Sequence, residues 1–252
     1  MNKRMDPLGE NAVRLCFGTT ISLNTHKRIR SFCALLQENK PKAVVEWVPA
    51  YTSVTVYYEP RDSTYHDICL VLGLLYEKAN ITSHSSVRLV TIPVCYGGEF
   101  GEDLQTVANH NGLSIQQVIE YHSSRLYVVF MLGFSPGFPY LGGMDERIAT
   151  PRLASPRLKV AKGSVGIAGQ QTGIYSLSTP GGWQIIGRTP LSLFDINNER
   201  PVLLEAGDIV QFRSITSEEY ETIYSSIQTN TYKLEIRVVE EDDDVITSRL
   251  KL

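Results

Sequence analysis

The sequence predicts an α+β protein made of two units, a small α/β unit followed by a β-rich one. Two observations support this. The first 92 residues alternate between strand-like and helix-like apolar patterns, and the residues after Pro93 give short strands separated by Gly and Pro. With 252 residues, of which 42% are hydrophobic, the chain is long enough to bury a substantial core.

The first unit, residues 1–92, shows the order strand, helix, strand, strand, helix, strand. Apolar residues alternate in the strands and recur every three or four residues in the helices. Strands are expected at 12–17, 43–48, 53–58 and 86–92, and helices around 29–36 and 68–79. This order is the split pattern of ferredoxin-like domains, in which 86–92 would be the closing strand.

Pro93 and the Gly97-Gly98 turn mark the expected start of the second unit, residues 93–228. Two short helices are expected at 103–109 and 115–122, and a capping box of Ser114 and Gln117 opens the second one. Short strands follow, with the sequences LYVVFML, KGSVGIAG, GIYSLS, WQIIG and IVQFRSI. Strands of this length, punctuated by Gly and Pro, indicate a β-barrel or a β-sandwich.

The second unit is expected to end in a helix at 216–227, which Thr216 and Glu219 cap. Residues 229–252 are then expected to form a C-terminal extension. It contains one more alternating, strand-like stretch and the acidic run Glu240 to Asp244.

Composition and motifs indicate a soluble, cytoplasmic protein. No apolar run is long enough to span a bilayer, and the start MNKRMDPLGENAVRL lacks the apolar region of a signal peptide. The four cysteines form no CxxC pair and lie among apolar residues, which favours buried thiols over disulfides. The five histidines show neither HExxH nor HxH spacing, so we expect no metal site.

One segment concentrates the features that point to function. Residues 133–195 hold 11 of the 19 glycines and half of the 12 prolines, which specifies tight turns. From Arg147 to Phe194 the chain has six basic residues and no Asp or Glu, although its net charge is −3. A compact cationic segment of this kind predicts a surface for a carboxylate or a phosphate.

Within that segment, Gly133 to Gly137 matches the GxSxG pattern of hydrolase nucleophiles. In such an elbow the residue after the serine gives a backbone N–H to the oxyanion hole. Here that residue is Pro136, which has no N–H. The match therefore predicts a Pro-Gly turn and not a serine nucleophile.

The stretch DLQTVANHNGLSIQQVIEY resembles a DNA-binding helix-turn-helix, but its charge argues against nucleic acid. Gly97 to Ser124 contains four acidic residues and no Lys or Arg, so it cannot neutralise phosphates. We expect a packed helical hairpin instead. The chain also lacks GxxxxGK[ST] and GxGxxG motifs, so no nucleotide cofactor is predicted to bind by those routes.

Five residues are candidates for a site on the basis of their type and position. Arg157 and Arg188 lie next to Gly or Pro, and each guanidinium can clamp a carboxylate with two hydrogen bonds. Gln171 and Thr172 lie in a Gly-flanked turn and offer neutral donors and acceptors. His122 ends a helix before the central strand. The alternatives are an exposed barrel edge for the arginines, turn hydrogen bonds for Gln171 and Thr172, and a core or capping role for His122.

Seven segments together resemble the KipI/PxpB family, also called allophanate hydrolase subunit 1. They are YGGEFGEDL, GFSPGFPYLGG, ATPR, SPR, GSVGIAGQQTGIY, PGGWQIIGRTPLSLFD and LLEAGDIVQF. The resemblance extends from about Gly9 to the helix near Ser217 and leaves the region after Thr229 uncovered. It implies a small N-terminal α/β domain followed by a cyclophilin-like β-barrel. Prolyl isomerase activity is not implied, because no stretch resembles FHRVIPGFMIQGG.

The same resemblance implies an activity that depends on partners. Its most widespread form is the PxpB component of an ATP-dependent 5-oxoprolinase, which converts 5-oxo-L-proline to L-glutamate with a PxpA-like subunit and a PxpC/KipA-like subunit. ATP would be used by the complex. Two alternatives remain open at this point: a KipI-like inhibitor of a sensor histidine kinase, and a subunit related to allophanate hydrolase and urea carboxylase.

These interpretations assign roles to the candidate residues. Arg157 and Arg188 would hold the substrate carboxylate or a phosphorylated intermediate, His122 would carry a proton, and Gln171 and Thr172 would orient groups at the subunit interface. If the chain is instead a regulator, exposed aromatic side chains in the Pro-rich turn would anchor a protein partner. These aromatic residues are Phe134, Phe138 and Tyr140.

Overall fold

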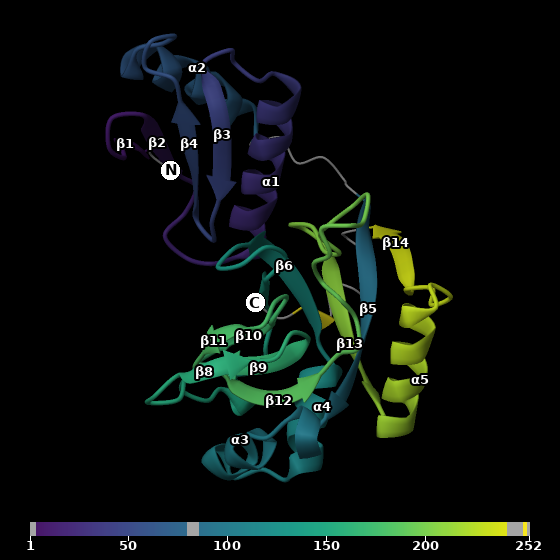
Figure 1. Ribbon diagram of the computed structural model, residues 1–252. Coiled ribbons are helices and arrows are strands. Elements are labelled where there is room, and N and C mark those ends of the chain that lie inside the picture. The colour runs from purple at the N-terminus through teal and green to yellow at the C-terminus, as the bar shows by residue number, and fades with distance from the viewer. Residues whose placement is uncertain (1–3, 80–85, 241–248, 251–252) are drawn as a thin grey trace. The chain divides into compact units, whose positions relative to one another are not determined.

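The computed structural model describes residues 4–79, 86–240 and 249–250, and it divides into two compact units, Met1–His84 and Ser85–Lys251 (Figure 1). Each unit has a hydrophobic core of its own. The α+β class predicted from the sequence is therefore confirmed.

Four strands and two helices make up the described part of the first unit. They are β1 (Arg4–Pro7), β2 (Ala12–Cys16), α1 (Leu23–Glu38), β3 (Val44–Pro49), β4 (Ser53–Tyr58) and α2 (Tyr65–Lys78). The strands form an antiparallel sheet in the order β1-β2-β4-β3.

The two helices of this unit begin at side-chain caps and bury one face each. The hydroxyls of Ser22 and Thr64 accept hydrogen bonds from the backbone N–H groups of Thr25 and Asp67, which satisfies donors that the first helical turn leaves free. The apolar faces of both helices pack with the strands into one core. Its fully buried members include Val13, Leu15, Phe32, Val56 and Leu72.

The predicted ferredoxin-like arrangement is not observed, because its closing strand belongs to the other unit. Residues 86–92 do form a strand, but it is part of β5 (Ser86–Tyr96), which pairs with strands of the second unit. In the first unit, β1 occupies the sheet edge beside β2. The boundary therefore lies before β5, and the prediction of domains at 1–92 and 93–228 placed it too late.

β5 belongs to the second unit because of its length and because of the apolar face that it buries there. Val90, Ile92 and Val94 alternate along it and all lie in the core of the second unit. The strand continues through Pro93, which the sequence suggested as a breaker, and its parallel register with β13 extends from Leu89 to Cys95.

The second unit is a closed barrel of seven strands in the described part of the chain. Around the barrel the order is β12, β9, β10, β7, β6, β13, β5, and the pairing of β12 with β5 closes it. The strands besides β5 are β6 (Leu126–Leu132), β7 (Pro139–Gly142), β9 (Ser164–Ala168), β10 (Gln171–Ile174), β12 (Gln184–Arg188) and β13 (Ile209–Ile215). Of the two alternatives left by the sequence, barrel and sandwich, the structure has the barrel.

Further elements lie on this barrel. A two-stranded sheet is formed by β8 (Arg157–Val160) and β11 (Thr179–Gly181). The helical elements are η1 (Gly98–Phe100), α3 (Leu104–Asn111), α4 (Ile115–Ser123), η2 (Glu146–Ile148) and α5 (Ser217–Gln228). Both predicted capping boxes, at Ser114 and at Thr216, are present. The predicted helical hairpin is confirmed as α3 and α4.

Part of the predicted C-terminal extension belongs to the barrel unit. Residues Ile236–Glu240 form β14, which pairs antiparallel with the first half of β5 (Figure 1). The alternating pattern there therefore marks an edge strand and not a separate tail. The acidic run lies outside the described residues after Glu240.

Candidate functional site

A glycine-rich turn between β5 and α3 forms one wall of the candidate site. Gly97 and Gly98 have φ values of +72° and +53°, which glycine adopts without strain. A Cβ on Gly101 would lie 2.1 Å from the carbonyl oxygen of Ile186, so only glycine allows this close approach to β12. The turn is thereby held against the barrel, and it presents Glu99, Phe100 and Glu102 beside β12.

Asp103, at the end of this turn, fixes it to two other segments. One carboxylate oxygen accepts a hydrogen bond of 2.6 Å from the N–H of Ile185 in β12. The other accepts one of 2.7 Å from Nη2 of Arg157 in β8. Asp103 is buried, so this carboxylate needs both partners.

Arg157, predicted to bind substrate, is occupied within its own chain. Besides Asp103, its Nε lies 2.9 Å from Oε1 of Glu102, and its Nη1 donates to the carbonyl oxygen of Trp183 at 3.3 Å. The side chain thus uses its donors to join β8 to the glycine-rich turn and to Trp183, the residue before β12. Its position is that of a residue which shapes the site and not of a free anion ligand.

Arg188 lies in a different environment, although its sequence context is similar. It ends β12, and its guanidinium carbon is 5.8 Å from the centre of the Phe100 ring. Its Nε atom is buried and has no hydrogen-bond partner among the described residues. No carboxylate among the described residues forms an ion pair with the Arg188 guanidinium. Arg188 therefore keeps donor capacity that the protein itself does not use.

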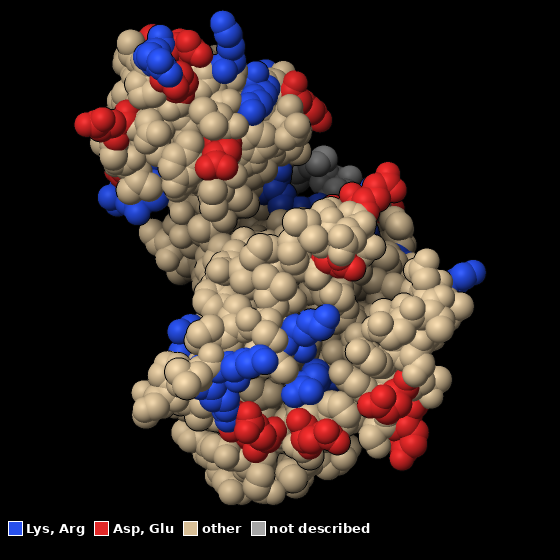
Figure 2. Space-filling view, viewed as in Figure 1, with Lys and Arg blue, Asp and Glu red and all other residues tan. Residues whose placement is uncertain are grey.

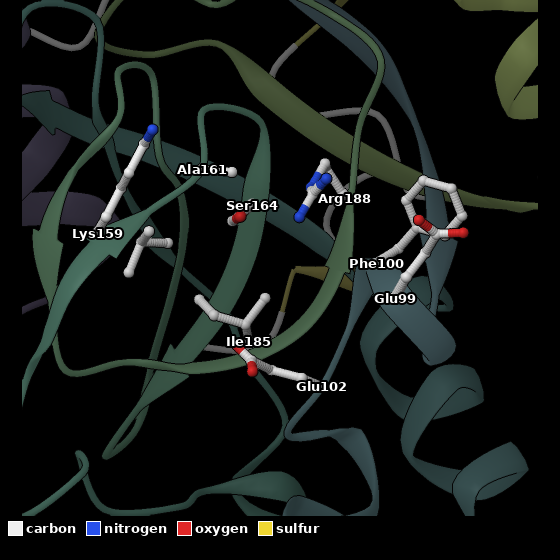
Figure 3. A pocket seen from close by; sticks show the side chains of 9 residues that line it. Glu99, Phe100, Glu102, Lys159, Ala161, Ser164, Ile185 and Arg188 are labelled. Atoms are coloured by element: carbon white, nitrogen blue, oxygen red, sulfur yellow. The ribbon is translucent and has the colours of Figure 1, made fainter.

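These elements enclose a cavity of about 200 Å³. It is lined by Glu99, Phe100, Glu102, Lys159, Val160, Ala161, Ser164, Ile185 and Arg188. Figure 3 shows the Arg188 guanidinium between Phe100 on one side and Ser164 on the other, with Lys159 beyond Ser164. We call this cavity the Arg188 pocket.

Charges of both signs surround the Arg188 pocket. Figure 2 shows Lys and Arg side chains gathered on one face of the second unit, with Asp and Glu side chains directly beside them. At the pocket the cations are Lys159 and Arg188 and the anions are Glu99 and Glu102. The predicted cationic surface is present, but the acidic residues that adjoin it come from the turn before α3, far away in the sequence.

His122 does not lie at this pocket. Its side chain is 0% exposed and sits in the barrel interior, with Nδ1 2.8 Å from the Tyr96 hydroxyl and Nε2 2.9 Å from the Thr172 hydroxyl. Thr172 donates its own proton to the carbonyl oxygen of Gly166, so it accepts from His122. The neutral ring therefore carries its proton on Nε2, and Tyr96 donates to Nδ1.

Burial keeps this histidine neutral, because it lowers the pKa of His122 to about 3. With both ring nitrogens engaged and no exposure, His122 is placed as a core residue, and the geometry gives no support to the predicted proton-carrying role. Thr172 is equally buried and belongs to the same network. Gln171 is half-buried at the start of β10 and does not line the Arg188 pocket.

The predicted partner-binding aromatic residues surround a second cavity, of about 270 Å³. Phe138 is only 2% exposed and forms edge-on contacts with four other rings at centroid distances of 5.3 to 5.6 Å. Those rings belong to Phe134, Tyr140, Tyr175 and Trp183. Phe138 thus builds the floor of this aromatic groove, and Phe134, which is 65% exposed, is its accessible rim.

Phe134 also has an unusual backbone. Its φ is +64°, and the N–H of Ser135 donates to the carbonyl oxygen of Gly133 at 2.7 Å, which makes a three-residue turn of the strained kind. The next hydroxyl, that of Ser135, lies 3.1 Å from the Ser176 hydroxyl. The partner of this serine is therefore another serine and not a general base, which agrees with the absence of an N–H at Pro136.

Several site residues were missed by sequence reasoning. Glu99, Phe100, Glu102 and Asp103 lie in the YGGEFGEDL segment, which predicts a turn, carries acidic charge and belongs to the family resemblance, but none of the four was predicted to belong to a site. The signal that identifies them is the concentration of glycines, because such a turn allows close backbone approach. Ser164 gave no signal of its own.

Two further properties bear on function. Within residues 4–79, 86–240 and 249–250, no cluster of three or more His, Cys, Asp or Glu side chains is arranged to hold a metal ion. None of the described helices has the length and apolar character needed to cross a bilayer.

Comparison with known proteins identifies the family. Residues 3–204 match the model of the carboxyltransferase domain, subdomain C and D. The chain belongs to this family. Two bacterial relatives are similar to it over nearly their whole length.

Both relatives are named as the B component of 5-oxoprolinase. The protein from Bacillus subtilis is 44% identical over 231 residues, which cover 86% of this chain and 95% of the relative. The one from Escherichia coli O157:H7 is 48% identical over 205 residues, which cover 81% of this chain and 93% of the relative.

Solved structures are similar as well. The protein TTHA0988 is 34% identical, with a TM-score of 0.73 over 82% of this chain and 40% of that one. The urea amidolyase of Kluyveromyces lactis has a TM-score of 0.76 over 98% of this chain and 17% of that one. At 20% identity the latter shows a shared fold only.

Proposed function

We propose that this chain is the PxpB component of an ATP-dependent 5-oxoprolinase complex, which cleaves 5-oxo-L-proline to L-glutamate together with a PxpA-like subunit and a PxpC/KipA-like subunit. The observation that carries the proposal is the identity of 44% and 48% to two 5-oxoprolinase B components over 95% and 93% of their lengths. Under this proposal the seven-stranded barrel is of the cyclophilin-like type and the complex works in the cytoplasm.

The chemistry of lactam opening supports a shared site. An unstrained five-membered lactam resists hydrolysis, so the reaction uses ATP to form a reactive phosphorylated intermediate. The sequence has no GxxxxGK[ST] loop, and the proposal therefore assigns ATP binding to a partner subunit. This chain would supply the carboxylate-binding residue Arg188, with Arg157 as the positioning residue of that site.

The aromatic groove is the proposed contact with a partner subunit. It combines an exposed Phe134 with a floor of buried rings, the arrangement in which aromatic anchors contribute most to binding. Tyr140 completes the same groove from β7.

The test is reconstitution of the three-subunit complex from purified proteins. We expect formation of L-glutamate and ADP from 5-oxo-L-proline only when this chain, both partners and ATP are present. Omission of each component in turn provides the controls. Equal turnover without this chain would contradict the proposal.

A second candidate, a part in urea carboxylation, is favoured by one observation. A urea amidolyase from Saccharomyces cerevisiae is 24% identical over 258 residues, although the matched region is only 14% of that protein. The same reconstitution separates the two, because a urea-carboxylating assembly would consume bicarbonate and urea and leave 5-oxo-L-proline unchanged.

A further inference from the structure

The Arg188 pocket carries charges that select among the ligands of the proposed reaction. We infer that it binds the carboxylate of a small monoanion that also has an N–H donor, with Arg188 as the carboxylate ligand, and that it disfavours nucleotide phosphates. The identity of the monoanion as 5-oxoproline rests on the proposed function. Its charge and size rest on the pocket alone.

Arg188 has a donor that the described part of the chain does not use. A buried N–H without an acceptor is costly, and most buried polar groups in proteins have a partner. The Nε of Arg188 is buried and unpartnered among the described residues, whereas the nearby Arg157 is fully engaged with Asp103 and Glu102. A planar carboxylate matches the two-pronged edge of a guanidinium, which makes it the anion that suits Arg188.

Charge around the Arg188 pocket is balanced. Lys159 and Arg188 form no ion pair with a described residue, whereas Glu102 and Asp103 both bind Arg157 and Glu99 is left unpaired. The three cations and the three carboxylates offset one another, so the pocket has no surplus of positive charge for a polyanion. A monocarboxylate on Arg188 adds one negative charge, whereas a phosphate group adds more at neutral pH and would be repelled by Glu99.

Glu99 also gives the pocket an acceptor. It is exposed and forms no ion pair with any described residue. A carboxylate is an acceptor only, so it favours a ligand that donates an N–H. A lactam N–H or an ammonium group meets that need, and a purely anionic ligand does not.

The size of the Arg188 pocket limits the ligand. The cavity of about 200 Å³ is smaller than the ~300–1,000 Å³ typical of drug-sized ligands. It has room for a single small ring with a carboxylate but not for a complete nucleotide. The ring of Phe100 and the side chain of Ile185 provide apolar surface for such a ring.

The walls are held in place before any ligand arrives. Asp103 joins the glycine-rich turn to β12 and, through Arg157, to β8. Glu99 and Arg188 are therefore presented from segments that the protein itself fixes. Preorganisation of this kind lowers the cost of binding a small ligand.

The main experiment is steady-state kinetics of the reconstituted complex with Arg188→Ala and Arg188→Lys. We expect Arg188→Ala to raise the KM for 5-oxo-L-proline about 10- to 100-fold, since a charge-assisted hydrogen bond to the substrate carboxylate is lost, while the KM for ATP stays within about twofold. Arg188→Lys should recover part of the loss. Arg200→Ala is the matched control, because Arg200 is 82% exposed and lies outside the pocket.

Calorimetric binding to the purified chain separates the inference from the proposed function. The complex could lack 5-oxoprolinase activity while the wild-type chain still binds 5-oxo-L-proline. If Arg188→Ala abolishes that binding, the inferred carboxylate site is supported even though the proposed function fails. An unchanged KM in Arg188→Ala would overturn the inference. Tighter binding of ATP or inorganic phosphate than of 5-oxo-L-proline at this pocket would also overturn it. If the complex is inactive and the purified chain binds no carboxylate, the inference fails as well.

Discussion

The barrel unit contains two polar regions that differ in whether their buried hydrogen-bonding groups have partners within the protein. In the interior, His122, Tyr96 and Thr172 form a chain in which each donor and acceptor of the imidazole has a partner from the protein. At the Arg188 pocket a buried donor is left without one among the described residues. A closed network of this kind stabilises the fold, and under our inference the unpartnered donor of Arg188 is the one that a ligand completes.

Breaking the closed network should give the largest effect. His122→Ala removes the partner of the Tyr96 hydroxyl and one of the two partners of the Thr172 hydroxyl, and it opens a cavity, so we expect the free energy of unfolding to fall by roughly 3–4 kcal/mol. Chemical denaturation measures this. His110→Ala, on the exposed side of α3, is the control and should change stability by less than about 0.5 kcal/mol. A His122→Ala protein of unchanged stability that had lost turnover would restore the catalytic role.

Arg157 holds the wall of the Arg188 pocket in place through Asp103 and Glu102. Arg157→Ala leaves the buried Asp103 carboxylate without its cation, and we expect a loss of roughly 2–3 kcal/mol in the free energy of unfolding. The KM for 5-oxo-L-proline should rise as well, because the turn that carries Glu99 loosens. The double variant Arg157→Ala, Asp103→Asn should regain part of the stability. If the double variant is no more stable than the single one, the ion pair is not the cause.

The two arginines also show what the sequence could and could not predict. Both lie in the Gly/Pro-rich segment, and the sequence assigned them the same role. What separates them is Asp103, which is 54 residues from Arg157 in the chain and 2.7 Å away in space. No local pattern reports such a contact, so the sequence identified the cationic surface but not which cation is free.

The fold was predictable to a similar extent. Helix caps at Ser114 and Thr216 and the strand at 86–92 depend on local patterns, and each was found where expected. The pairing of that strand with β13 is a contact between distant segments, and β1 filled the edge that the sequence assigned to it. Local periodicity determines whether a segment is a helix or a strand. Which strand it pairs with depends on which hydrophobic core buries its apolar face.

Lowering the pH should destabilise the folded protein, because His122 in the closed network does not take up a proton while the chain is folded. The pKa of His122 is about 3 in the folded protein, below the 6.5 of an ordinary histidine. Between these values the unfolded chain binds a proton that the folded chain does not, so stability is fully present above pH 6.5 and falls as the pH drops toward 3. The slope for one such residue approaches about 1.4 kcal/mol per pH unit.

His26 adds to this slope, because burial also lowers its pKa to about 3. Denaturation at a series of pH values on wild type and His122→Gln isolates the contribution of His122. We expect the variant to have a shallower slope by about one proton. Identical slopes would show that His122 is not held neutral in the folded state.

The smallest effect is expected at the rim of the aromatic groove. Phe134→Gly relieves a positive φ in a strained turn, so the chain alone should be unchanged or more stable by up to about 1 kcal/mol. Its affinity for the partner subunit should fall at the same time, because the exposed ring is lost. Thermal denaturation and a titration with the partner measure the two effects. A less stable chain with unchanged affinity would assign Phe134 to folding and not to docking.

The most direct test of the open donor is the NMR signal of the Arg188 Nε–H group during titration with 5-oxo-L-proline. The signal can be assigned by its disappearance in Arg188→Lys. A progressive downfield shift that saturates, and that inorganic phosphate does not reproduce, is the result we predict. An Arg188 signal that stays in place while the ligand binds elsewhere on the chain would contradict the assignment of this pocket.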